Sequence, residues 1–206
     1  MRAQEGIMTA AAAPATPDDA VLGGLLDVVA GDPAVAEVVR RARLTGTAQA
    51  TEHLEITAPG AMYPFVVAAL GSPRAASRPV LAVTATAREA EDLAAALGSL
   101  LPEHAVAEFP AWETLPHERL SPSSDTVGRR LAVLRRLAHP SDDDPAAGPV
   151  RVLVAPIRAV LQPVVQGLGD LEPVSVQTGD DIALDELVRR LAAAAFTSCG
   201  GVTDYC

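Results

Sequence analysis

The sequence predicts an α/β fold, in which a parallel sheet is flanked by helices. The first observation is the near-continuous apolar run Pro79–Ala85, which is typical of a parallel strand buried on both faces. Residues 105–109 and 151–155 form two further short apolar runs. Segments with helical periodicity separate these runs, and such alternation of strand and helix favours a parallel sheet. A chain of 206 residues is long enough for one or two domains of this kind.

The N-terminal part divides into a tail and two short helices. Residues 1–17 are rich in Ala, Pro and Thr, and this composition predicts a disordered N-terminus. Within residues 18–50 we expect N-terminal helices over 18–30 and over 33–43. A glycine ends the first helix, and a proline begins the second in the turn where helices tolerate it.

The next segment predicts a strand, a turn and two helices. A capping box formed by Thr86 and Glu89 marks the start of the second helix, because each side chain can bond the backbone of the other. The expected elements are a strand over His53–Ala58, a turn at Pro59–Gly60, a helix over 64–70 and a helix from the capping box to Leu100.

The stretch Phe109–Leu137 contains the chain's single tryptophan, Trp112, and ends in an amphipathic helix. Ser124 and Asp125 are the expected helix caps, since their side-chain oxygens can accept from free backbone N–H groups. An apolar stripe is expected on one face and arginines off it. The stripe comprises Val127, Leu131, Leu134 and Leu137, and the arginines are Arg129, Arg130, Arg135 and Arg136.

The C-terminal part begins with an acidic linker over 139–149, whose run Ser141–Asp144 is expected to be solvated. After the strand at 151–155 and a short helix behind Pro156, we expect a strand over 174–178 that Gly179 turns. A last helix should run from 181 or 184 to 195. No useful periodicity remains after Phe196.

The tryptophan stretch also carries a family resemblance. Its pattern, FPxWETLPxExLSPxxDxxxxRLxxLxRL, resembles the N-terminal module of bacterial transcription-repair coupling factors and, more distantly, the excision-repair protein UvrB. The resemblance covers about residues 20–196 of this chain, whereas the family protein is several times longer. It implies a P-loop NTPase-like, RecA-like sheet of the kind found in the first domain (1a) of UvrB.

The resemblance further implies a division into domains. Residues 51–167 look like a UvrB-like α/β domain, and residues 168–196 look like the start of a second, small α+β domain that docks UvrA in the family. Residues 197–206 depart from the family pattern and are expected to be an aberrant tail. We therefore expect an N-terminal fragment, ended by a frameshift or a premature stop.

A phosphate-binding loop would follow the first strand of such a sheet, with the pattern G-x-x-x-x-G-K-[ST]. Here that turn contains Thr57, Pro59, Gly60 and Ala61, without the lysine or the second glycine, and prolines remove N–H donors from it. We expect this degenerate loop to bind no nucleotide. The resemblance places ATP and Mg in a separate motor module that this chain lacks, so no cofactor is expected here.

Residues for recognition are expected around the tryptophan. Trp112, Glu113, Arg129 and Arg130 are the interaction candidates, although a core or solvated role is the simpler interpretation of each. The nearby His117, Ser121, Ser123, Ser124 and Asp125 lack the G-x-S-x-G elbow of a hydrolase, so no catalytic residue is expected. Cys199 and Cys206 match no common metal-site spacing, and no metal site is expected.

Charge and hydropathy limit the choice of partner. A net charge of -10 argues against a free-standing nucleic-acid binder, because such proteins must neutralise phosphates. No apolar run reaches the ~20 residues of a membrane span, and no signal sequence is recognisable, so we expect a cytoplasmic protein without membrane contact. The resemblance implies UvrA as a partner, with RNA polymerase and DNA bound only through missing parts. Alternatives are a small nucleotide-binding P-loop-like hydrolase or a stand-alone acidic interaction protein.

Overall fold

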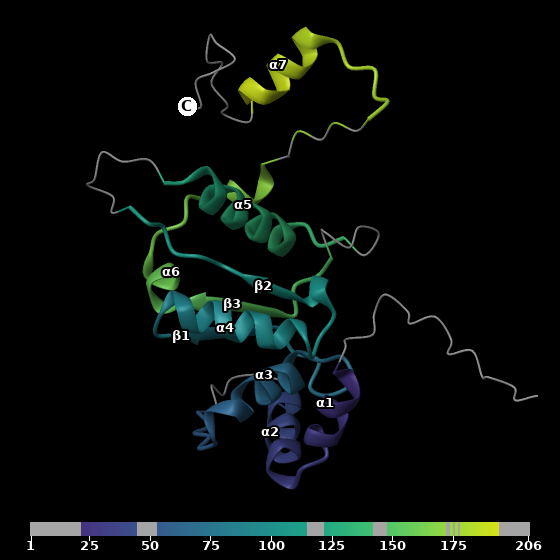
Figure 1. Ribbon diagram of the computed structural model, residues 1–206, viewed down its shortest axis with the longest axis vertical. Coiled ribbons are helices and arrows are strands. Elements are labelled where there is room, and N and C mark those ends of the chain that lie inside the picture. Colours follow the sequence, from purple (N-terminus) through teal and green to yellow (C-terminus); the bar gives the residue numbers. More distant parts are fainter. Residues whose placement is uncertain are drawn as a thin grey trace, which may run out of the picture. The chain divides into compact units, whose positions relative to one another are not determined.

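The computed structural model describes residues 22–44, 53–114, 122–141, 148–171, 174, 176 and 178–193 (Figure 1). The chain divides into two compact units. The first contains the described residues up to Ala111 together with Val150–Val160, and the second contains Trp112–Pro149 and the residues from Leu161 onward. Each unit is described by itself.

A parallel sheet of three strands forms the centre of the first unit. Its strands are β1 (Val80–Thr84), β2 (Val106–Glu108) and β3 (Val152–Pro156), in the order β1-β3-β2. Val80 and Val106 both lie opposite Val152, so all three strands start at the same level. The three strands predicted from the apolar runs, and the α/β class with a parallel sheet, are confirmed.

Two helices build the core against this sheet. Helix α4 (Ala87–Gly98) contacts all three strands, and α3 (Tyr63–Gly71) contacts β1 and β3 (Figure 1). The core contains several side chains with no exposed surface, among them Ala90, Leu97, Val152 and Val154. The predicted capping box begins α4: the Glu89 N–H donates to Thr86 Oγ1 over 3.2 Å, and the Thr86 N–H donates to Glu89 Oε2 over 3.2 Å.

One prediction about the sheet is wrong. The apolar run that forms β1 was expected to be buried on both faces, but Leu81 and Val83 are 53% and 46% exposed. Val80 and Ala82, which alternate with them, pack against the core. Strand β1 lies at one end of the strand order, next to β3 alone among the described strands. An apolar run shows that a strand tolerates burial, but it does not show how many of its faces are covered.

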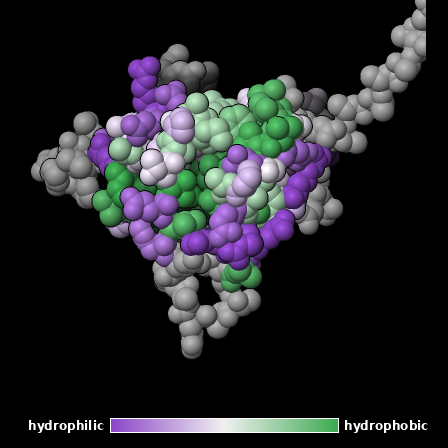
Figure 2. Space-filling model, turned by 90° about the horizontal axis from the view of Figure 1, so that it is seen from below, coloured by the Kyte–Doolittle hydropathy of each residue, from purple (hydrophilic) through white to green (hydrophobic). Residues whose placement is uncertain are grey.

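The N-terminal helices are confirmed as α1 (Gly23–Ala30) and α2 (Pro33–Leu44). Gly31 is the C-cap of α1, as expected, and both helices contact α3. Leu26, Val35 and Val39 contribute to the same buried cluster as Ala68 and Ala69. Figure 2 shows the molecule from the end where α1 and α2 lie in Figure 1, and its apolar residues form patches between hydrophilic ones.

The predicted strand over His53–Ala58 is absent, which is a second correction. Residues 53–59 have no regular structure, and residues 53–57 are exposed. They lead into a short 3-10 helix, η1 (Gly60–Met62), and then into α3. A strand needs a hydrogen-bonded neighbour, and these residues pair with none of the three described strands, although β1 and β2 each have β3 as their one partner among them.

The remaining part of the first unit connects its main elements. Helix η2 (Glu103–Ala105) precedes β2, and the predicted short helix after Pro156 is present as α6 (Ile157–Leu161), whose last residue belongs to the second unit. None of the described helices is both long and apolar enough to cross a membrane.

The second unit contains α5 (Ser124–Ala138), η3 (Leu168–Asp170) and α7 (Leu184–Ala193). Helix α5 packs on η3, where a Cβ atom on Gly169 would lie only 2.9 Å from the Leu134 carbonyl oxygen. Only glycine therefore allows this approach. The expected turn at Gly179 is confirmed by its φ of 104°. The strand predicted over 174–178 lies partly outside the described residues; 174, 176 and 178, which are described, are not assigned to a strand.

Candidate interaction site around Trp112

Gln162 holds the backbone of Trp112 at two points. The Trp112 N–H donates to Gln162 Oε1 over 2.7 Å, and Gln162 Nε2 donates to the Trp112 carbonyl oxygen over 3.2 Å. One amide side chain thus supplies both partners that a neighbouring strand would supply. Sequence reasoning missed Gln162, and the only signal in the sequence is a lone polar residue within the apolar segment LQPVV.

Arg130 lies over the ring of Trp112, with its guanidinium carbon 4.3 Å from the ring centroid. The arginine is only 1% exposed, so its predicted place on the solvated side of the helix is wrong. A planar, weakly hydrated guanidinium can be buried against an aromatic face at lower cost than a compact ammonium. Burial lowers the pKa of Arg130, but arginine stays charged in proteins.

The buried side of α5 therefore differs from the predicted apolar stripe. Thr126, Arg130 and Val133 are buried, at the spacing of one helix face. The predicted stripe is less covered: Val127, Leu131 and Leu134 are only half-buried, and Leu137 is 48% exposed. Periodicity located the helix correctly, but it placed the centre of the buried face about one residue away. The centre is occupied by Arg130, and a charged residue does not count toward an apolar stripe.

Glu113 connects the start of the loop to the start of α5. Its carboxylate accepts from the Ser123 N–H over 3.0 Å, from Ser123 Oγ over 2.6 Å and from Thr126 Oγ1 over 2.6 Å. These hydrogen bonds, those of Ser123 and Thr126 first, lower the pKa of Glu113 to about 2. They favour the ionised form because each one donates to it.

The cap of α5 is Ser123, not Ser124 or Asp125 as predicted. Its Oγ accepts from the Thr126 N–H over 3.3 Å. The same serine also bonds the Glu113 carboxylate, so the residue that caps α5 is the one that Glu113 holds in place. The three adjacent residues Ser-Ser-Asp are equally good capping candidates in the sequence. The hydrogen bonds from Ser123 to the Glu113 carboxylate favour Ser123 as the cap.

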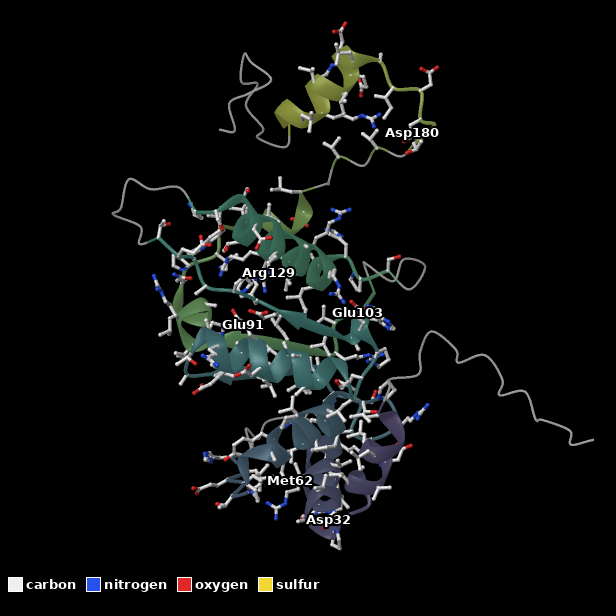
Figure 3. The ribbon with its side chains drawn as sticks, in the orientation of Figure 1. Asp32, Met62, Glu91, Glu103, Arg129 and Asp180 are labelled. Carbon is white, nitrogen blue, oxygen red and sulfur yellow. The ribbon has the colours of Figure 1, made fainter. Side chains whose placement is uncertain are left out.

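The four predicted interaction residues differ in accessibility. Glu113 and Arg129 are exposed, Trp112 is half-buried and Arg130 is buried. Figure 3 labels Arg129 beside α5. The side chains that reach the surface here are those of Glu113, whose carboxylate accepts three hydrogen bonds, of Arg129, and part of the Trp112 ring. The Ser123 hydroxyl bonds Glu113 and Thr126, and within the described residues it bonds no histidine. His117 and Ser121 lie outside the described residues.

The predicted degenerate phosphate loop lies in the first unit. Thr57, Pro59, Gly60 and Ala61 are exposed, directly before and within η1. The Met62 N–H donates to the Pro59 carbonyl oxygen over 2.8 Å, and Pro59 itself has no N–H. A phosphate cradle needs several consecutive N–H groups directed at one anion, and Pro59 interrupts the N–H groups of this segment. Within the described residues, no group of three His, Cys, Asp or Glu side chains could hold a metal ion.

Comparison with known proteins places the chain among relatives. No protein-family model matches it. The transcription-repair-coupling factors of Mycobacterium bovis and Mycobacterium tuberculosis are each 42% identical to it over 179 residues, which cover 87% of this chain. The chain spans only 14% of the length of these relatives. The resemblance predicted from the Trp112 motif is thereby confirmed: over most of its length, this chain is similar to one segment of the transcription-repair-coupling factors.

Proposed function

We propose that this chain acts in transcription-repair coupling as a binding segment without catalysis of its own. The observation that carries the proposal is the 42% identity over 179 residues with two transcription-repair-coupling factors. In the intact protein, an ATP-dependent motor would release RNA polymerase stalled at a DNA lesion, and the UvrB-like module would recruit UvrA. Contacts with RNA polymerase and DNA would belong to parts that this chain does not span.

The proposed fold is a P-loop-like, UvrB-type domain that no longer binds a triphosphate. The three parallel strands and the helices on them support this assignment. The loop at Thr57–Ala61 supports the loss of nucleotide binding, because it has no lysine and because Pro59 interrupts its N–H groups. ATP and Mg would then be bound by the motor of the intact protein.

The partner that we propose is the repair protein UvrA, and the Trp112 site is the surface that we propose for it. Gln162 holds the Trp112 backbone and Glu113 bonds Ser123, so binding would order few additional groups at these residues. The exposed Arg129 would supply a charge-assisted contact, and the exposed part of Trp112 an apolar one. A net charge of -10 favours a protein partner over DNA.

The test measures binding of purified UvrA to the immobilised chain by biolayer interferometry. We expect saturable binding that Arg129→Ala weakens about fivefold, within the range for a charge at an interface. Arg158→Ala is the matched control, because Arg158 is an exposed arginine on α6 of the first unit. Equal loss in both variants, or no binding to UvrA, would remove the Trp112 site as the proposed surface.

A second measurement separates the proposal from the hydrolase alternative. Calorimetric titration of the chain with ATP and Mg should give no binding heat. Saturable binding that is abolished by changes near Gly60 would instead support a nucleotide-binding enzyme with an unusual loop.

A further inference from the structure

Strand β1 has β3 as its only neighbour among the described strands, so one of its edges is open. The Val80 N–H donates to the Arg151 carbonyl oxygen over 2.9 Å, which directs the backbone groups of Val80 toward β3. In a parallel ladder, the backbone groups of successive residues point to opposite edges of a strand. Leu81 and Val83 therefore direct their N–H and C=O groups toward the open edge, where no described residue bonds them.

The side chains at this edge are apolar and accessible. Leu81 and Val83 are the exposed residues of β1, on the face opposite to Val80 and Ala82, which pack against the core. Natural edge strands usually carry a charged residue, a proline or a bulge that prevents pairing with another chain. Residues 80–87 contain no charged residue and no proline, and the ladder between β1 and β3 is unbroken. The open edge of β1 therefore has the properties of a strand that accepts another strand.

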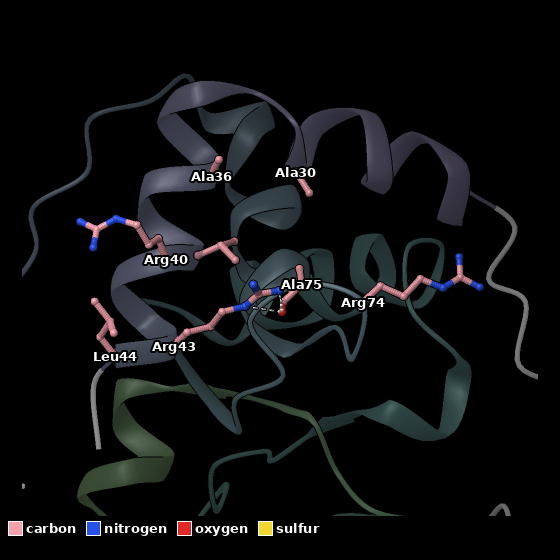
Figure 4. A pocket seen from close by; sticks show the side chains of 8 residues that line it. Ala30, Ala36, Arg40, Arg43, Leu44, Arg74 and Ala75 are labelled. Atoms are coloured by element: carbon pink, nitrogen blue, oxygen red, sulfur yellow. Dashed lines mark hydrogen bonds between the residues drawn. The ribbon is translucent and has the colours of Figure 1, made fainter. Parts of the chain in front are cut away.

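Two arginines fix the turn between α3 and β1. Arg43 of α2 donates to the Ala75 carbonyl oxygen through Nε over 3.0 Å and Nη2 over 2.6 Å (Figure 4). Arg78 donates in the opposite direction, through Nε to the Ala42 carbonyl oxygen over 2.9 Å. Because the turn is bonded to α2 and the strand is bonded to β3, β1 is ordered before any partner binds. This order lowers the entropic cost of pairing.

We propose that the open edge of β1 pairs with β1 of a second copy of this chain, antiparallel and centred on Ala82. In this register Leu81 lies opposite Val83 of the second copy, and the two residues exchange both of their N–H···O bonds. These bonds use every open N–H and C=O group of Leu81 and Val83 in both copies. Directly opposite residues share a face of the sheet, so the same register packs Leu81 against Val83 of the second copy. The edge is thus complementary to itself in hydrogen bonding and in side-chain packing.

The charge of the chain favours this strand as the contact between two copies. Each copy has a net charge of -10, so the copies repel each other. Residues 79–87 bring no charge to the contact, and the nearest charged residues on either side are Arg78 and Arg88, so the acidic residues that cause the repulsion lie outside it. Pairing along one strand buries little surface, and the dimer should therefore be weak, with a dissociation constant of about 100 µM.

The test measures association of the purified chain by sedimentation equilibrium from about 5 µM to about 500 µM. We expect a reversible monomer–dimer equilibrium that strengthens as salt rises from about 50 mM to about 500 mM, because salt screens the repulsion between two acidic copies. Amide hydrogen exchange, followed by NMR at both ends of the concentration range, reports the register. The amides of Leu81 and Val83 should exchange about threefold more slowly at the high concentration, whereas those of Val80 and Ala82, which point to β3, should be unchanged.

Two variants with the same substitution test the surface. Val83→Lys places a charge opposite Leu81 of the second copy and should weaken dimerisation at least about tenfold. Val28→Lys is the matched control, because it changes a more exposed valine on α1, and it should leave the dimer unchanged. Val83→Thr keeps the β-branched shape and should keep most of the association, which separates the effect of charge from that of any substitution at this position. Far-UV circular dichroism compares the folding of the variants.

Several results would overturn the proposal. A monomer at every concentration, or a dimer that leaves exchange at Leu81 and Val83 unchanged, would remove the edge of β1 as the contact. Equal weakening by Val28→Lys and Val83→Lys would show that the contact is not this edge. Slower exchange at Leu54 and Ile56 together with β1 would replace the symmetric pairing by pairing with residues 53–58 of the second copy. Neither readout involves UvrA, and the Trp112 site belongs to the other unit, so this inference and the proposed function fail separately.

Discussion

Replacing Arg130 by alanine should destabilise the second unit. Among the arginines that the structure describes in this unit, we expect this replacement to have the largest effect. Arg130 is 1% exposed and lies 4.3 Å from the centroid of the Trp112 ring. Alanine would remove the cation and most of the buried aliphatic stem, and it would leave a space beside the indole.

The magnitude follows from two losses and one gain. Losing two buried methylenes costs about 1.6 kcal/mol at ~0.8 kcal/mol each, and losing a desolvated cation over tryptophan costs about 2 kcal/mol. Burial opposes the charge, as the lowered pKa of Arg130 indicates, so its removal returns part of this energy. The net loss of unfolding free energy should be about 2–3 kcal/mol. With a urea slope of about 1–3 kcal/mol per M, the midpoint should fall by about 0.7–3 M.

The assay is urea unfolding followed by tryptophan emission, because Trp112 is the only tryptophan of the chain and belongs to the second unit. Arg130→Met keeps the apolar length beside the ring and removes the cation, so it should lose about half as much. A midpoint for Arg130→Ala within error of the unchanged chain would refute the reasoning. A loss for Arg130→Met as large as for Arg130→Ala would show that the charge alone is responsible.

Three further changes test other features. Glu113 has a pKa of about 2, below its ordinary 4.5, so its carboxylate should stabilise the fold above pH 4.5 and lose this effect as the pH falls to about 2. A carboxyl NMR titration checks the midpoint, and Glu113→Gln should remove this pH dependence of stability. Thr86→Ala breaks the capping box of α4 and should cost about 1 kcal/mol by thermal unfolding, whereas an unchanged melting temperature would contradict the cap. Gly71→Ala would place a Cβ 2.6 Å from a methyl of the fully buried Val152 and should cost about 1–3 kcal/mol. Gly128→Ala meets nothing within 4 Å and should instead stabilise α5 by about 0.5–1 kcal/mol, so equal signs for the two glycine variants would refute the packing argument.

Local features of the sequence determined most of the regular elements. The apolar runs gave β1, β2 and β3, the Thr-x-x-Glu pattern gave the start of α4, and Gly31 and Gly179 marked an end and a turn. The Trp112 motif also gave the resemblance that the coupling factors confirm. These signals are readable because each depends on residues a few positions apart, or on one uninterrupted stretch.

Tertiary structure alone decided how the elements are paired and which sides are covered. The residues at 53–58 have strand-like composition but do not join the described sheet, and Leu81 and Val83 stay exposed although their run is apolar. Arg130 became the most buried residue of α5 because a tryptophan 18 positions earlier in the sequence lies under it. Gln162 reaches the Trp112 backbone across 50 residues. Such choices depend on partners brought together by the whole chain, and neither periodicity nor residue type carries that information.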